Sequence, residues 1–146
     1  MHLVAEDVAA AVSIPLLHIV DTAARHLRSL GVRRVALLGT RFTMEDPSYR
    51  KRLADGFGGD VLIPGPDDRA TVHRIIFDEL VKGRFESSSR DQFRAIMARL
   101  VDDGAEAIIL GCTEIGLLVG PPDSPVPLID TLELHALAAV ELSLAP

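Results

Sequence analysis

The chain has few of the residue types that build disulfides, thiolate metal sites and aromatic clusters. Its 146 residues include one cysteine, no tryptophan, one tyrosine and five phenylalanines. A single cysteine excludes an internal disulfide and a metal site made of several thiolates. It also fits the reducing cytoplasm, so we expect a cytoplasmic protein.

Basic clusters and long apolar runs are missing as well. The formal net charge is −6, and the lysines and arginines form no continuous stripe. Because nucleic-acid binding needs clustered positive charge, we expect no nucleic-acid partner. No uncharged run reaches the ~18 residues of a membrane-spanning helix, and the first residues lack the basic-then-apolar pattern of a signal peptide. We therefore expect no membrane association.

What the chain does contain is mostly apolar. Apolar residues make up 48% of it, and its mean hydropathy is +0.26. The length suits one ordinary domain with a real core. The hydropathy is high for a free-standing soluble domain with so few aromatic residues. We interpret it as a sign that some apolar surface packs against something outside this chain.

Helical and strand patterns alternate along the sequence, which predicts an α/β fold with a mainly parallel sheet. Short apolar runs predict the strands, and the clearest run is entered by charges and closes at Gly39. The candidate strands are residues 14–19 (IPLLHI), 33–39 (RRVALLG), 60–63 (DVLI), 105–111 (AEAIILG) and 126–129 (VPLI).

Apolar residues at helical spacing predict the helices between these strands. The spans are residues 4–12, 20–30, 72–82, 93–101 and the Ala/Leu-rich segment after Asp130. Residues 40–47 are predicted to be a loop, with Pro47 in the first turn of the next helix. Ser89 and Gln92 have the spacing of a capping box, and Gly104 suits a helix end.

Cys112 is the main candidate for chemistry. It directly follows a predicted strand and a glycine, and ligands in open α/β sheets bind at the carboxyl ends of strands. We expect the backbone N–H groups of a following helical turn to lower its pKa, which makes a thiol a better nucleophile or proton-transferring base. The alternative is an inert buried cysteine, because free cysteine packs like a small apolar residue.

Four segments resemble, in the same order, motifs of the aspartate/glutamate racemase family, and they span almost the whole chain. Residues 111–114 (GCTE), after AEAIIL, resemble the family's second cysteine motif. Residues 37–45 (LLGTRFTME) resemble its strand and threonine-rich loop. Residues 79–83 (ELVKG) resemble the helix end with its substrate-binding lysine, and residues 127–131 (PLIDT) resemble the strand before its last helix.

The resemblance implies a cofactor-independent racemase of the aspartate/glutamate type, which acts on an acidic amino acid. Such an enzyme removes the α-proton from one face of the substrate and returns a proton to the other, and the family uses two cysteines for this. Cys112 would be one of them. Met1-His2 resembles the tail of the family's first cysteine motif. The chain is therefore expected to begin just after the first catalytic cysteine and to be incomplete.

The resemblance also implies two similar α/β lobes with the active site between them. Residues 31–126 would form the second lobe, and residues 1–30 would be a remnant of the first. Residues 127–146 would supply a strand end and a closing helix that returns to the first lobe. We expect the chain alone to be inactive and poorly soluble or self-associated, and homo-oligomerisation is left open.

Further residues are candidates for binding the substrate, and each has a competing structural role. They are Thr113 and Glu114 beside the cysteine, Thr40 and Thr43 after another predicted strand, and Lys82 at a helix end. The alternative role of Thr40 and Thr43 is to form hydrogen bonds in a turn or at a helix cap. The alternative role of Lys82 is a favourable contact with the helix dipole.

Asp130 and the histidines are assigned structural roles. Asp130 is expected to cap the last helix rather than to contact the substrate. His18 follows an apolar run and is interpreted as a structural histidine whose ring nitrogens are hydrogen-bonded. His73 and His135 lie on predicted helices without metal-ligand spacing, so no metal is expected.

Other functions remain open. A decarboxylase or isomerase of the same superfamily would need only one cysteine, which is the number in this chain. A non-catalytic binding remnant would leave Cys112 with a structural role alone. A Cys–His hydrolase is disfavoured because no Asn or Asp partner pattern accompanies Cys112.

Overall fold

A four-stranded parallel sheet forms the centre of the computed structural model, which describes residues 4–144. The strands are β1 (Arg34–Leu38), β2 (Asp60–Leu62), β3 (Ala107–Leu110) and β4 (Leu128–Asp130), in the order β2-β1-β3-β4. The central strands β1 and β3 pair from Val35 with Ala107 to Leu38 with Leu110. The α/β fold with a parallel sheet predicted from the sequence is thus confirmed.

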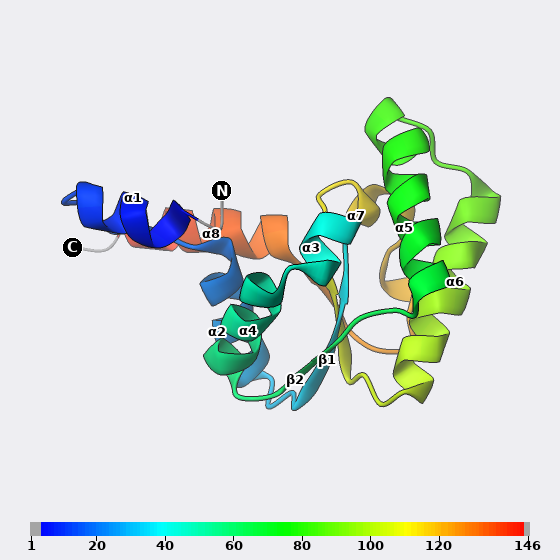
Figure 1. Ribbon diagram of the computed structural model, residues 1–146, viewed down its shortest axis with the longest axis horizontal. Helices are drawn as coiled ribbons and strands as arrows, with labels where there is room; N and C mark the ends of the chain where they lie inside the picture. The colour runs from blue at the N-terminus through cyan, green and yellow to red at the C-terminus, as the bar shows by residue number, and fades with distance from the viewer. Residues whose placement is uncertain (1–3, 145–146) are drawn as a thin grey trace.

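Helices cover both faces of the sheet (Figure 1). They are α1 (Ala5–Ala11), α2 (Ile19–Ser29), α3 (Arg41–Glu45), α4 (Pro47–Phe57), α5 (Pro66–Asp78), α6 (Ser87–Asp102), α7 (Ile115–Leu118) and α8 (Thr131–Leu144), with the 3-10 turns η2 (Leu80–Lys82) and η3 (Pro121–Asp123). Helices α5 and α6 lie on one face. Helices α2 and α4 lie on the other, where α8 packs against α2.

The alternation of side chains along the strands creates two cores. Ala36 and Leu38 of β1 pack with α5 and α6, whereas Val35 and Leu37 pack with α2 and α4. All four are fully buried. Because both faces of the sheet are covered, the central strands are apolar throughout rather than alternately apolar and polar.

The direction of the chain across the sheet reverses between β1 and β3. From β1 the chain passes through α4, on one face, to β2. From β3 it passes through α7, on the opposite face, to β4. In an open parallel sheet such a reversal leaves a crevice between the carboxyl ends of the two strands, and ligands bind there. Residues 39–43 and 111–114 directly follow the two strands at this point of reversal, and the space beside these strand ends is called the crevice below.

The strand predicted at residues 14–19 is wrong. Residues 12–18 form no strand, and Ile14 is 72% exposed. Pro15 lacks a backbone donor, and the sheet within residues 4–144 offers this segment no partner strand. His18 instead caps α2, because its Nδ1 accepts a hydrogen bond of 3.2 Å from the backbone N–H of Val20.

Three local expectations along the middle of the chain also need correction. Residues 40–47 are not a plain loop, because α3 forms there with Thr40 as its cap. The helix predicted to reach Lys82 ends at Asp78, and η2 continues it. Ser89 does not cap α6, which begins at Ser87. Ser89 is buried inside that helix and donates a hydrogen bond to Glu79.

Other helix boundaries follow the expectation. Pro47 is in the first turn of α4, and Gly104 ends α6 with a φ of 95° in the left-handed region that favours glycine. Asp130 caps α8: its Oδ1 accepts the backbone N–H of Leu132 at 2.8 Å and that of Glu133 at 3.2 Å.

Helices α1 and α8 and the segment between α1 and α2 expose many apolar side chains. This α1/α8 surface comprises Val8, Val12, Ile14, Leu16, Leu132, Leu137, Val140, Leu142 and Leu144. Helix α8 is apolar on all sides rather than along one stripe, which is typical of a helix that is buried all round. The expected unpartnered apolar surface is therefore present. Between residues 4 and 144, no helix is long and apolar enough to cross a membrane.

Candidate active site

The close approach of β1 and β3 at their carboxyl ends brings the predicted site residues together. The backbone N–H of Gly111 donates to the carbonyl of Leu38 at 2.7 Å. A Cβ added to Gly111 would lie 2.9 Å from that oxygen, and one added to Gly39 would lie 3.3 Å from the Gly111 oxygen. Glycine at both positions therefore lets the loops that carry Thr40 and Cys112 leave the sheet side by side.

Cys112 and Thr113 both donate hydrogen bonds to one oxygen of Glu114. Cys112 Sγ lies 2.9 Å from Glu114 Oε2, and Thr113 Oγ1 lies 2.8 Å from the same atom. Cys112 and Glu114 are half-buried, whereas Thr113 is exposed. These three candidates form one hydrogen-bonded group directly before α7, in which the thiol and the Thr113 hydroxyl donate and the Glu114 carboxylate accepts.

The expectation of a lowered pKa at Cys112 is wrong. Burial and the hydrogen bond to Glu114 raise the pKa of the Cys112 thiol to about 12. The thiol hydrogen bond in turn lowers the pKa of Glu114, and the Thr113 hydroxyl adds to this lowering. A backbone N–H does act on Cys112 in the expected direction, but burial and the carboxylate outweigh it. At neutral pH the proton is therefore on sulfur and the negative charge is on the carboxylate.

Thr40 and Thr43 lie together on the β1 side of the crevice. Thr40 Oγ1 is 3.2 Å from Thr43 Oγ1, and it accepts the backbone N–H of Thr43 at 3.3 Å. A Cβ added to Gly111 would lie 3.4 Å from Thr43 Cγ2, so Thr43 borders the residue that precedes Cys112. The helix-cap role holds for Thr40, and both hydroxyls also lie at the crevice.

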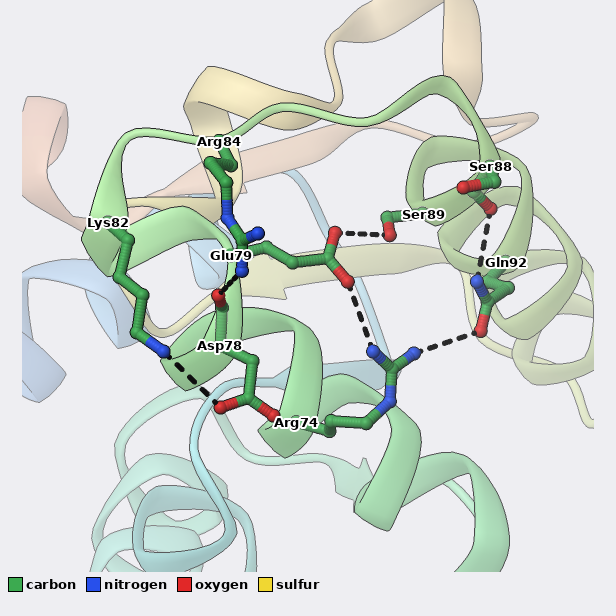
Figure 2. Close-up of polar contacts among 8 residues, drawn as sticks. All are labelled: Arg74, Asp78, Glu79, Lys82, Arg84, Ser88, Ser89 and Gln92. Atoms are coloured by element: carbon green, nitrogen blue, oxygen red, sulfur yellow. Dashed lines mark hydrogen bonds and ion pairs between the residues drawn. The ribbon is translucent and has the colours of Figure 1, made fainter.

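Lys82 lies on η2, which packs against α7. Its Nζ is 3.6 Å from Asp78 Oδ1, and the side chain is 57% exposed (Figure 2). The neighbouring Glu79 connects this turn to two helices. It accepts a hydrogen bond from the Ser89 hydroxyl of α6 at 2.5 Å and one from the Arg74 guanidinium of α5 at 3.0 Å. Lys82 therefore lies on an anchored turn beside the site, where its ammonium pairs with Asp78 at the end of α5.

Comparison with known proteins identifies the family of this chain. The model of the Asp/Glu/hydantoin racemase family matches residues 1–139. The chain belongs to this family. The crystal structure of a proposed Asp/Glu racemase from Yersinia pestis is 45% identical, with a TM-score of 0.95 over 99% of this chain. An aspartate racemase homologue from Pyrococcus horikoshii is 36% identical, with a TM-score of 0.89 over 97% of it.

A curated relative of this racemase-family chain is a broad specificity amino-acid racemase from Bacillus subtilis. The two are 24% identical over 99% of this chain. The match covers 61% of the Bacillus protein, 63% of the Yersinia chain and 62% of the Pyrococcus chain. The chain thus spans less than two thirds of the length of these relatives.

Two residues at the end of β4 complete the crevice of this racemase-family fold. Thr131 is buried, and its hydroxyl donates to the carbonyl of Leu110, the last residue of β3, at 2.9 Å. Asp130 Oδ2 lies 2.9 Å from where a Cβ on Gly116 would be, so Asp130 borders α7 as well as capping α8. Sequence reasoning assigned no site role to either residue. The available signal was a polar Asp-Thr pair directly after a predicted strand.

A separate hollow of about 430 Å³ lies between α1, α2 and α4, and His18, Tyr49 and Arg52 are among its lining residues. Cys112 does not line it. Arg52 is already paired with Asp21 through hydrogen bonds of 2.6 and 2.7 Å. In the described part of this racemase-family chain, no three His, Cys, Asp or Glu side chains meet as metal ligands.

Proposed function

We propose that this chain carries one acid/base half of a cofactor-independent amino-acid racemase, with Cys112 as the proton-transferring group. The observation that carries the proposal is the hydrogen bond from Cys112 to Glu114 at the crevice between β1 and β3. A thiol with a perturbed pKa at the carboxyl ends of parallel strands is a site candidate on physical grounds. Membership of the racemase family supports the reaction class.

Racemisation requires a base on one face of the substrate Cα and an acid on the other. Because the pKa of Cys112 is well above neutral, its resting form is the thiol, which donates its proton to the α-carbanion. Donation leaves a thiolate, and this thiolate takes an α-proton when the reaction runs in reverse. Cys112 is the one cysteine of the chain, so a second thiol must come from polypeptide outside these 146 residues.

The other residues of the crevice would hold the substrate. Thr40, Thr43 and Thr113 offer hydroxyl donors for a substrate carboxylate, and the Glu114 carboxylate offers an acceptor for the substrate ammonium. Lys82 would exchange its partner Asp78 for a substrate carboxylate.

The lobe division follows from the same proposal. Residues 31–126 would form the lobe that carries Cys112. Residues 1–30 and 127–146 would then contact a second lobe through the α1/α8 surface. The exposure of that surface supports this division.

The test is a chimera in which this chain replaces the matching part of the Yersinia pestis protein. We expect it to interconvert D- and L-aspartate or D- and L-glutamate, and Cys112→Ser to reduce kcat about 10²- to 10⁴-fold, the usual contribution of a positioned acid/base group. In D₂O, α-proton exchange from a single enantiomer should survive in the variant, because the opposing base remains. Half-normal racemisation in a folded Cys112→Ser chimera would exclude Cys112 from the catalytic pair.

A further inference from the structure

His73 of α5 reaches across to the start of α3. Its Nδ1 accepts the backbone N–H of Arg41, the first residue of α3, at 3.2 Å. Arg41 follows Thr40 directly and precedes Thr43 by two residues, so the bond holds the turn that carries both threonines. This contact joins two elements that are 32 positions apart in the sequence.

Aromatic rings hold the imidazole in place. The Phe42 ring meets His73 edge-on with a centroid distance of 5.9 Å, and the Phe77 ring lies 4.7 Å away at 53°. Phe42 is 76% exposed, whereas Met44 near the other end of α3 is fully buried, so burial holds the end of this helix rather than its first residues. Within residues 4–144, the contact from α5 to the first backbone N–H of α3 is the one made by His73.

The hydrogen bond requires a neutral imidazole. Nδ1 can accept only while it carries a lone pair, so the neutral ring must have its proton on Nε2. The contact therefore needs an acceptor atom at the position of Nδ1, and a side chain without one would lose the bond.

Helix α3 has a second directional contact with α5, because Glu45 pairs with Arg69 at 3.0 Å. That pair involves the last residue of α3, whereas His73 contacts the first.

We propose that His73 is the positioning residue of the Thr40–Thr43 turn. The meaning for substrate binding rests on the proposed function, but the positioning itself requires no catalysis. If the turn binds a substrate carboxylate, loss of the His73 acceptor weakens that binding.

The experiment follows the backbone amides of Arg41 and Thr43 by NMR at a single pH, in the 146-residue chain with Leu137→Lys and Val140→Lys, two changes on the α1/α8 surface that are expected to favour the monomer. Water-exchange rates are divided by the intrinsic rate of each amide. His73→Phe keeps an aromatic ring without the acceptor, so we expect the protection of both amides to fall roughly fivefold, the size expected for one lost hydrogen bond. His73→Asn keeps an acceptor near the position of Nδ1, so protection should stay close to that of the chain with His73.

Several outcomes would overturn the proposal. One is undiminished protection in His73→Phe, and another is equal protection in His73→Phe and His73→Asn. A fall at Arg41 without a fall at Thr43 would show that His73 does not position the threonines. His26→Asn, on the opposite face of the sheet, is the matched control and should behave like the wild type. None of these measurements depends on racemase activity, so a failure of this proposal can be distinguished from a failure of the proposed function.

Discussion

Glu114 determines where the proton of Cys112 is located. It accepts hydrogen bonds from the thiol and from Thr113, and both bonds are strongest when it is ionised. The same carboxylate raises the pKa of Cys112, as burial does. The sequence places this residue two positions after the cysteine but does not indicate which of the two groups is protonated.

Glu114→Gln should make Cys112 more reactive at a given pH. The substitution removes the negative charge and the strong acceptor, both of which raise the pKa of the thiol. The thiolate should therefore appear at lower pH than in the wild type, where the pKa of Cys112 is about 12. The measurement is the pH dependence of the rate of Cys112 alkylation by iodoacetamide. Glu106→Gln, which removes an equal charge elsewhere, should leave the profile unchanged. An unaltered or upward-shifted profile in Glu114→Gln would contradict this role of the carboxylate.

Lys82→Ala should weaken transition-state binding in the chimera if its ammonium meets a substrate carboxylate. A charge-assisted hydrogen bond is worth about 1.5–3 kcal/mol, so kcat/KM should fall by roughly one to two orders of magnitude. The nearby Arg84→Ala removes the same charge from the loop after η2 and should have little effect. Steady-state kinetics on both variants check this. Unchanged kinetics in Lys82→Ala would leave Lys82 with only its pairing to Asp78.

At the residue scale, the sequence predicted the positions of the candidate side chains better than their protonation. Thr40, Thr43 and Cys112 were each predicted to follow a strand, and they do lie at neighbouring strand ends, because a short apolar run ending in glycine identifies such an end. The pKa of Cys112 could not be predicted in the same way. It depends on burial and on the direction of the Glu114 side chain, which only the folded chain defines.

At the scale of elements, the crevice depends on glycine at the ends of β1 and β3. Gly111→Ala would place a Cβ 2.9 Å from the carbonyl of Leu38 and 3.0 Å from the side chain of Leu37. Both neighbours belong to a buried central strand, so the backbone of β3 would have to move. We expect a loss of about 1–3 kcal/mol in the free energy of unfolding, measured by urea denaturation.

The matched control is Gly120→Ala, where the added Cβ would meet only the ring of Pro122 at 3.8 Å, an ordinary contact. Its effect should stay within about 0.5 kcal/mol. Equal stability of the two variants would show that the strand ends can separate without cost.

The elements that the sequence predicted correctly are those determined by the residues of the segment itself. Strands β1 and β3 are continuous apolar runs, and α6 has an uninterrupted apolar stripe ended by Gly104. The segment 14–19 has an equally apolar pattern, but whether it becomes a strand depends on a partner strand. Ser89 has cap spacing, but its hydroxyl bonds to Glu79, ten residues away, and a local motif cannot show this.

At the scale of the whole molecule, the α1/α8 surface governs how the chain behaves alone. Leu137 and Val140 of α8 are each 54% exposed, and Leu16 is 43% exposed. Exposed apolar patches of several hundred Å² favour association. We expect the isolated 146-residue chain to self-associate and to show no D/L interconversion of aspartate or glutamate, as judged by size-exclusion chromatography with light scattering and by a chiral assay.

Charged substitutions locate the surface responsible. Leu137→Lys combined with Val140→Lys should shift the chain toward monomer. Leu30→Lys, at a 49% exposed leucine outside the α1/α8 surface, should not. A wild-type chain that is monomeric and racemises either amino acid would contradict both the unpartnered surface and the need for a second thiol.

The packing of α8 against α2 also has a consequence for synthesis. Helix α2 is translated before any strand of the sheet, whereas α8 is translated after all four. The layer formed by α2 and α4 is completed only when Leu134 of α8 packs against it. Throughout elongation on the ribosome, this side of the nascent chain therefore lacks its last helix and is accessible to chaperones, while the layer of α5 and α6 can already close.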